Sequence, residues 1–297
     1  LRGHQVEMVD IIRESAQSLL GIVDDILDFS KIEAGKLELA PVPFSPAALV
    51  RSVCLLLDRM ALNQDVELTM YTDPALPAQV LGDELRLRQV LMNLLSNAIK
   101  FSSKLDRQGK VAVRLYMSDR SDNAVNLSFH VIDNGIGMDA ATQARLFSPF
   151  SQADVSTTRQ YGGTGLGLSI SDSLVRAMGG DIKVSSEKQK GSEFRFAVRL
   201  PIIANETPAP VVADLTGTCC VVWPDYQGVD WAAYLRAAGA RVYRPEEVPE
   251  AAAHDSALWL LVRDTGLESE GSIQWTENVA LPVWPASYHW LLIGRGY

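Results

Sequence analysis

The chain has 297 residues, of which 47% are hydrophobic, and a formal net charge of -9 at pH 7. This length predicts about two domains, each with enough apolar side chains for a buried core. The negative charge argues against nucleic acid or an anionic membrane surface as a partner, and we find neither a signal peptide nor an apolar run near the roughly 18 residues of a membrane span.

An amphipathic helix is predicted from Gln5 to about Lys36, because apolar residues recur there every three or four positions. No apolar segment follows until Ala47, so we expect this stripe to pack on another helix. The only histidine in the region is His4, which we expect to be a surface residue.

Prolines and a serine between residues 41 and 46 are expected to end this first unit. A helix from Ala47 to about Asn63 should follow, and then a strand from Val66 to Tyr71. A loop with two prolines and a short segment from Gln79 to Leu81 complete this region.

A second helix is predicted from Asp83 to Phe101, with acids in its first turn and apolar residues at helical spacing. Asn93, Asn97 and Lys100 fall within roughly 60° of one another on this helix. Amide oxygens suit Mg²⁺ and an ammonium suits phosphate oxygens, so this face could hold a metal-triphosphate. The alternative is an ordinary solvated polar face.

Two strand patterns, Lys110 to Met117 and Ala124 to Ile132, flank a charged turn and predict a hairpin. The second strand runs into Asp133-Asn134-Gly135-Ile136-Gly137. A carboxylate at a strand end, beside glycine backbone that a planar ligand can approach, is typical of a nucleotide pocket. The alternative is a common turn.

A glycine-rich run, Gly162-Gly163-Thr164-Gly165-Leu166-Gly167, stands at the start of another helical pattern that Gly179 closes. Glycines there let backbone N–H groups and the helix N-terminus approach phosphate. The run is not a Walker loop, because the lysine is missing. Two further strands, Asp181 to Ser186 and Ser192 to Leu200, are predicted after it.

Four segments resemble, in order and spacing, the N, G1, F and G2 boxes of sensor histidine kinases. They are Asn93 to Phe101, Asp133 to Gly137, Leu146 to Gln152 and Gly163 to Leu168. The resemblance covers residues 1 to about 200 and implies the Bergerat ATP-binding fold, an α/β (α+β) sandwich with helices on one face of the sheet. It also implies ATP and Mg²⁺ as ligands.

The resemblance assigns roles to single residues. Asp133 would accept the adenine amino group, and Gly135 and Gly137 would shape the pocket. Asn97 would ligate Mg²⁺, with Asn93 beside it. Related ATPases of the gyrase and heat-shock chaperone type have a glutamate at the position of Asn93, and an amide cannot act as a general base. We therefore expect slow hydrolysis, which favours a kinase over an ATPase.

Lys100 would reach phosphate, and Gly163, Thr164, Gly165, Leu166 and Gly167 would flank the phosphates. The polar run from Gln152 to Tyr161 is similar to the mobile ATP lid of the family. Its only cation, Arg159, is assigned to the terminal phosphate, with a solvated lid arginine as the alternative.

The helix from Gln5 to Lys36 resembles the second helix of the dimerisation and histidine-phosphotransfer hairpin. The first helix, with the phosphoacceptor histidine, has no counterpart here, so no catalytic histidine is expected in the chain. We expect a truncated sequence from the cytoplasmic portion of a bacterial protein, with the phosphoacceptor and the sensory input upstream. The full-length protein would be a homodimer, with or without a membrane anchor.

After Pro201 a linker is expected, followed by alternating strands and helices that predict a parallel sheet. This part resembles a receiver domain, in a doubly wound α/β arrangement. Its acid pair is reduced to Asp225, and Asp264 would be the phosphoacceptor or a turn residue. A degenerate or truncated receiver that acts by docking is favoured over a phosphorylatable one.

The expected domains are residues 1–40, 41–203, a linker at 204–216, and 217–297. Three functions remain open at this stage. The first is the core of a hybrid histidine kinase that serves a histidine-phosphotransfer helix and a receiver or response regulator. The second is a slow ATPase, and the third is a non-catalytic module that binds a partner kinase.

Overall fold

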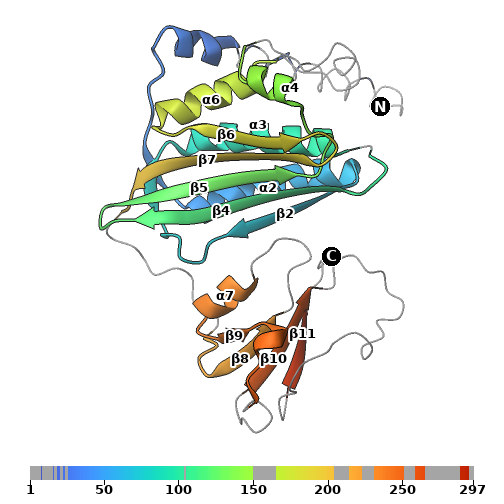
Figure 1. Cartoon of the computed structure of the whole chain (residues 1–297). Coiled ribbons are helices and arrows are strands. Elements are labelled where there is room, and N and C mark those ends of the chain that lie inside the picture. Colours follow the sequence, from blue (N-terminus) through green and yellow to red (C-terminus); the bar gives the residue numbers. More distant parts are fainter. Residues whose placement is uncertain are drawn as a thin grey trace. The chain divides into compact units, whose positions relative to one another are not determined.

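The structure is a computed structural model, and it describes residues 8, 16, 19, 20, 23, 26–103, 105–149, 165–203, 214–222, 231–250, 258–264 and 288–293. The chain divides into two compact units (Figure 1). Residues 1–68 and 79–204 form the first unit, and residues 69–78 and 205–297 form the second.

The described residues of the N-terminal segment are helical, with a continuous stretch at 26–33. Their apolar side chains are exposed, for example Leu19 at 62% and Leu20 at 64%. The described part of the chain therefore leaves this apolar stripe open.

One acidic side chain ties the end of this helix to the first unit. The Oδ2 atom of Asp28 accepts hydrogen bonds from Arg86 at 2.9 Å and from Gln89 at 2.8 Å. The Asp28 and Arg86 side chains are 13% and 17% exposed, so this ion pair is largely shielded from water. Downstream of the helix, the N–H of Ala40 donates to Asp83 at 2.9 Å.

In chain order up to residue 203, the elements are β1 (Val42–Phe44), α2 (Pro46–Asn63), β2 (Val66–Thr72), β3 (Val80–Gly82), α3 (Glu84–Ser102), β4 (Gly109–Arg120), β5 (Ala124–Asp133), α4 (Ala140–Arg145), α6 (Gly167–Ala177), β6 (Ile182–Glu187) and β7 (Gly191–Pro201). Between residues 41 and 203 the predicted helices and strands are confirmed within a few residues, whereas part of the helix predicted from Gln5 to Lys36 lies outside the described residues. Two elements were not predicted, β1, which pairs antiparallel with β3, and α4. The predicted turn after Met117 is shorter than expected, because β4 continues to Arg120 through an irregularity.

A five-stranded sheet with the order β2-β4-β5-β7-β6 is the base of the first unit. Its neighbours β4, β5, β7 and β6 are antiparallel. Alternate residues of β5, namely Val125, Leu127, Phe129 and Val131, are fully buried. Phe129 stacks on Phe196 of β7 with ring centroids 4.8 Å apart. This alternation places one sheet face in the core.

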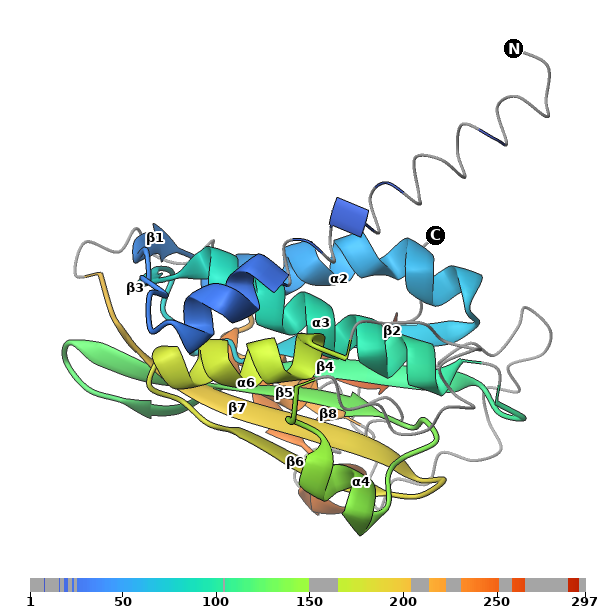
Figure 2. The ribbon, with the colours of Figure 1, turned by 90° about the horizontal axis from the view of Figure 1, so that it is seen from above.

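Helices α2, α3 and α6 lie side by side over that face, with α3 in the middle (Figures 1 and 2). The α3 residues Leu87, Val90, Leu91, Leu94, Leu95 and Ile99 point into the core and are at most 1% exposed. Burying each such side chain contributes about 1.5 to 3 kcal/mol, so α3 is anchored along its whole length.

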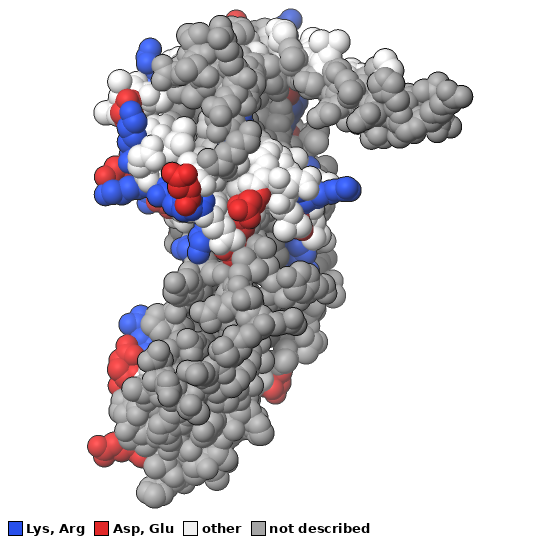
Figure 3. Space-filling model, turned by 90° about the vertical axis from the view of Figure 1, so that its right-hand side faces the viewer, with Lys and Arg blue, Asp and Glu red and all other residues white. Residues whose placement is uncertain are grey.

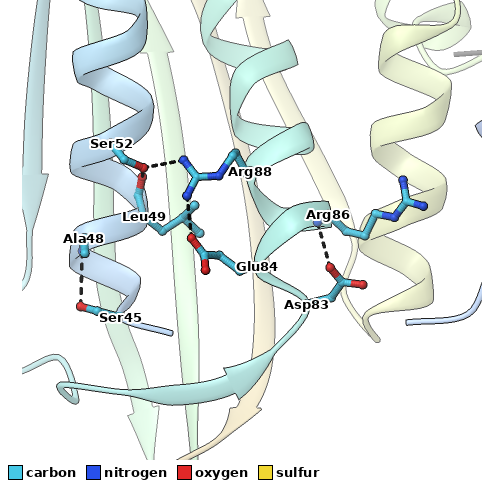
Figure 4. A network of polar contacts seen from close by, with 8 residues as sticks. All are labelled: Ser45, Ala48, Leu49, Ser52, Asp83, Glu84, Arg86 and Arg88. Atoms are coloured by element: carbon cyan, nitrogen blue, oxygen red, sulfur yellow. Dashed lines mark hydrogen bonds and ion pairs between the residues drawn. The ribbon is translucent and has the colours of Figure 1, made fainter. Parts of the chain in front are cut away.

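Polar caps set where α2 and α3 begin (Figure 4). The Ser45 hydroxyl accepts from the N–H of Ala48, and Asp83 accepts from the N–H of Arg86 at 3.0 Å. Arg88 reaches from α3 to Ser52 of α2 at 2.6 Å and also pairs with Glu84 of its own helix. These contacts fix the register of the two helices.

The second unit contains β8 (Thr218–Val222), α7 (Trp231–Ala237), β9 (Arg241–Tyr243), the 3-10 turn η1 (Pro245–Glu247), β10 (Leu258–Asp264) and β11 (Tyr288–Ile293). The strand order is β11-β10-β8-β9, and all three pairings are parallel. The predicted parallel sheet is therefore confirmed. Numbered along the chain, the four strands lie in the order 2-1-3-4.

Candidate functional site

A pocket of about 280 Å³ opens beside the ends of β5 and β7. Its lining comes from the second half of α3, the end of β5 and the segment after it, α4, the β6–β7 turn and the start of β7. The lining residues are Asn97, Ala98, Phe101, Asp133, Ile136, Gly137, Met138, Asp139, Thr142, Lys188, Gln189, Ser192 and Phe194. Such a mostly apolar hollow with a few convergent polar groups is typical of a small-molecule site.

Asp133 is the last residue of β5 and lies opposite Ser192 of β7 in the sheet register. Its Oδ1 atom accepts from the N–H of Gly135 at 2.8 Å and from the N–H of Ser192 at 3.2 Å. Burial raises the pKa of this carboxyl from 3.8 to about 6, although both hydrogen bonds act in the opposite direction. At pH 7 the pocket therefore holds an ionised, poorly hydrated acceptor.

The segment after Asp133 is held against two other parts of the backbone. A Cβ atom on Gly135 would lie 2.6 Å from the carbonyl oxygen of Phe101, and one on Gly137 would lie 2.0 Å from that of Glu187. Gly137 also has a φ of +61°, which favours glycine. We predicted that these glycines let a ligand approach the backbone closely. In the structure, the groups that approach Gly135 and Gly137 most closely are the backbone carbonyls of α3 and β6.

The two asparagines of α3 have different surroundings. Asn97 lines the pocket, and its Nδ2 atom donates to Oδ1 of Asn93 at 3.3 Å. Asn93 donates in turn to the Ser171 hydroxyl of α6 at 2.9 Å, and a Cβ on Gly167 would lie 2.4 Å from its Oδ1 atom. Asn93 thus joins α3 to α6, whereas Asn97 faces the pocket.

The side-chain oxygen of Asn97 suits Mg²⁺, because the hydrogen bond to Asn93 does not use it. The bond to Asn93 uses the nitrogen of the Asn97 amide, and the amide oxygen is the atom that ligates Mg²⁺. Among the described residues, no group of three or more His, Cys, Asp or Glu could hold a metal by itself. A metal ion at Asn97 would therefore also need oxygen atoms from the bound nucleotide, as Mg²⁺ in nucleotide sites commonly does.

Lys100 and the described part of the glycine-rich run, residues 165–167, are not among the residues that line this pocket. Burial lowers the pKa of Lys100, whose Nζ atom lies 5.4 Å from the centre of the Phe101 ring. Leu166 is 2% exposed, so its side chain belongs to the core. Gly165 has a φ of +72°, and α6 begins at Gly167.

Three predicted site residues, Arg159, Gly163 and Thr164, lie outside the described residues, as does Asp225. Asp264 ends β10, the third strand of the second unit along the chain. Because β8 and β10 are parallel neighbours, Asp264 stands at the same sheet edge as the end of β8.

Several lining residues escaped the sequence analysis, above all Ser192 and Phe194 of β7 and the turn residues Lys188 and Gln189. No local motif marks them. Ser192 comes beside Asp133 only through the register of β5 with β7, which the sequence analysis did not predict.

On the face of the first unit shown in Figure 3, Lys and Arg side chains alternate with Asp and Glu. The described residues there form no patch of a single sign. Within the described part of the chain, no helix is both long and apolar enough to cross a membrane.

Residues 82–202, which run from the end of β3 through β7, match the family described as histidine kinase-, DNA gyrase B-, and HSP90-like ATPase. Over 213 residues the chain is 42% identical to the sensor histidine kinase GacS of Pseudomonas protegens, covering 71% of this chain and 23% of GacS. Residues 82–202 therefore form a domain of this ATPase family, and the chain is similar to sensor histidine kinases. The family resemblance carried by the four motifs is thereby confirmed.

Two further histidine kinases are similar to this chain. Hybrid signal transduction histidine kinase A of Dictyostelium discoideum is 40% identical over 216 residues, which are 70% of this chain and 10% of that protein. The solved structure of full-length ShkA in complex with AMPPNP has a TM-score of 0.65 at 32% identity, and covers 89% of this chain and 53% of ShkA. The chain therefore spans less than a quarter of the length of these curated relatives.

Proposed function

We propose that this chain is the catalytic core of a histidine kinase, which binds Mg-ATP in the pocket at Asp133 and supplies the γ-phosphoryl group to a histidine side chain. The main support is the carboxylate of Asp133, which is held by the N–H groups of Gly135 and Ser192 and lines an otherwise largely apolar pocket. The adenine amino group is a donor that such an acceptor would select.

The residues that line the pocket would contact different parts of Mg-ATP. Phe101, Ile136 and Phe194 would contact the faces and edges of the base, and Asp133 would accept from its amino group. The Oδ1 atom of Asn97 would ligate Mg²⁺, which when bound would neutralise charge on the phosphate oxygens.

The phosphates would extend from the pocket toward Lys100 and the start of α6. Gly163, Gly165 and Gly167, with Thr164 and Leu166 between them, would offer backbone N–H groups to them. Arg159 would reach the terminal phosphate with its guanidinium fork.

Slow hydrolysis is the second element of the proposal. The Asn93 amide is engaged by Asn97 and Ser171, and an amide cannot take a proton from water. The terminal phosphoryl group would therefore persist until a histidine nucleophile arrives. This favours phosphotransfer over the ATPase alternative.

The histidine would come from a phosphotransfer helix of the same or a partner subunit. The exposed apolar stripe of the N-terminal helix supports its assignment to the dimerisation hairpin, and hence a homodimer. An aspartate of a receiver domain or response regulator would then take the phosphoryl group. We place this relay in the cytoplasm of a bacterium.

The second unit would be the receiver-like part of a hybrid kinase. Its strand order, 2-1-3-4 along the chain, agrees with the flavodoxin-like order 2-1-3-4-5. The position of Asp264 at the end of the third strand suits a phosphoacceptor, but the reduced acid set favours a receiver that acts by docking.

Labelling with γ-labelled ATP tests this function in the protein that contains both this chain and the phosphoacceptor helix. We expect acid-labile, base-stable phosphate on a histidine, and its loss in Asp133→Ala. Steady phosphate release without labelled protein would identify a slow ATPase instead. Absence of both labelling and release would favour the non-catalytic signalling module.

A further inference from the structure

Arg107 lies on the segment between α3 and β4 and contacts three carbonyl oxygens. Its Nη2 atom is 2.6 Å from the oxygen of Asn134, 3.3 Å from that of Gly135 and 2.7 Å from that of Gln189. Asn134 and Gly135 follow β5, whereas Gln189 lies in the β6–β7 turn. One exposed guanidinium thus joins two segments that are more than 50 residues apart in the chain.

Both of these segments form walls of the pocket, since Ile136 and Gly137 line it on one side and Lys188 and Gln189 on another. They are also bonded directly, because the N–H of Gln189 donates to the oxygen of Ile136 at 2.6 Å. The Gln189 backbone is therefore held through its N–H by Ile136 and through its carbonyl by Arg107.

Gln189 needs this support. Its φ is +66°, a left-handed conformation that is uncommon for residues other than glycine. Such a conformation persists only where surrounding contacts determine it. Without the Arg107 contact, we expect the turn to sample other conformations and to leave its place at the pocket.

A second set of bonds secures the same corner. The Asn134 side chain accepts from the N–H of Lys110 at 2.7 Å and donates to the carbonyl of Gln108 at 3.0 Å. The segment that carries Arg107 is thus fixed to the residue after Asp133. Arg107 is the part of this arrangement that extends to the β6–β7 turn.

We propose that Arg107 is a positioning residue, which holds the β6–β7 turn against the segment after Asp133 and so preorganises the base-binding end of the pocket. This inference rests on the proposed binding of ATP. Preorganised walls favour affinity because the ligand does not have to order them. Arg107 itself is not among the residues that line the pocket.

Calorimetric titration of the full chain with Mg-ADP and with a non-hydrolysable Mg-ATP analogue tests this role. The variants are Arg107→Ala, Arg107→Lys and, as a matched control, Arg51→Ala, an exposed arginine on α2. We expect Arg107→Ala to weaken both ligands by the same factor, roughly tenfold, which is the net effect of about one charge-assisted hydrogen bond. Arg107→Lys should restore part of the affinity, and Arg51→Ala should bind as the wild type does.

Several outcomes would overturn the inference. A loss restricted to the triphosphate analogue would mean that Arg107 contacts phosphate directly. A lower melting temperature with unchanged dissociation constants would mean that it only stabilises the fold. If the wild type binds neither nucleotide, the proposed function fails as a whole, whereas normal binding by Arg107→Ala removes this inference alone.

Discussion

Replacement of Asp133 by Asn should stabilise the empty protein while it weakens nucleotide binding. The pKa of Asp133 is raised from 3.8 to about 6 because burial disfavours its ionised form. The folded protein therefore binds this proton more tightly than the unfolded chain does. Its free energy of unfolding should fall as pH rises from about 4 to about 6, and it should remain lower above that range.

The size of this effect follows from the change in pKa. One pKa unit corresponds to about 1.4 kcal/mol, so the ionised carboxylate destabilises the folded state by at most about 3 kcal/mol at pH 8. Water that enters the pocket reduces this figure. An Asn at this position carries no charge and keeps an oxygen for the N–H groups of Gly135 and Ser192. We expect Asp133→Asn to gain about 1 to 2 kcal/mol at pH 8 and almost nothing at pH 4.

Urea denaturation without nucleotide at the two pH values measures this difference. Far-ultraviolet circular dichroism is the suitable probe, because all six tryptophans lie beyond residue 222 and their fluorescence would report on the second unit. The same variant should bind the ATP analogue at least tenfold more weakly, since a neutral amide is the poorer acceptor. Lower stability at pH 8, or an equal gain at both pH values, would refute the reasoning.

Three further experiments test other features of the molecule. Gly137→Ala should lower the free energy of unfolding by about 2 to 4 kcal/mol in the same denaturation experiment, because it combines left-handed strain with a Cβ 2.0 Å from a carbonyl oxygen. Gly179→Ala, at a φ of +81° with open space around it, should lose only about 1 to 2 kcal/mol, and equal losses would contradict the steric explanation. A double-mutant cycle with Asp28→Ala and Arg86→Ala should give a coupling energy of about 1 kcal/mol that decreases with added salt, whereas zero coupling would show that the ion pair does not hold the helix end. Lys100→Met should weaken the triphosphate analogue more than adenosine in competition titrations, and an equal loss for both would remove Lys100 from the phosphate site.

The sequence predicted the elements whose signals are local. Helix α3 combines a strong apolar period with Asp83 as its cap, so both its bounds and its buried face could be expected. Asp133 was recognisable because an acid followed by two glycines ends a clear strand. The short β1, with Pro43 inside it, and the short polar helix α4 lack a period that would reveal them.

Local sequence patterns could not predict contacts between segments that are distant in the chain. Nothing near Asn93 indicates that Ser171 of α6 would engage its amide. Arg107 reads as an ordinary loop arginine, and Ser192 becomes a neighbour of Asp133 only through the register of β5 with β7. These residues depend on tertiary geometry, which a single sequence encodes only through the whole fold.

Calorimetric titration with a non-hydrolysable ATP analogue and Mg²⁺ tests the central claim most directly, with Asp133→Ala and Asn97→Ala beside the wild type and Arg51→Ala as the control. We expect one site in the wild type and the control, and loss of binding in both pocket variants. Absence of binding by the wild type, or unchanged binding by Asp133→Ala, would contradict the assignment of this pocket to ATP.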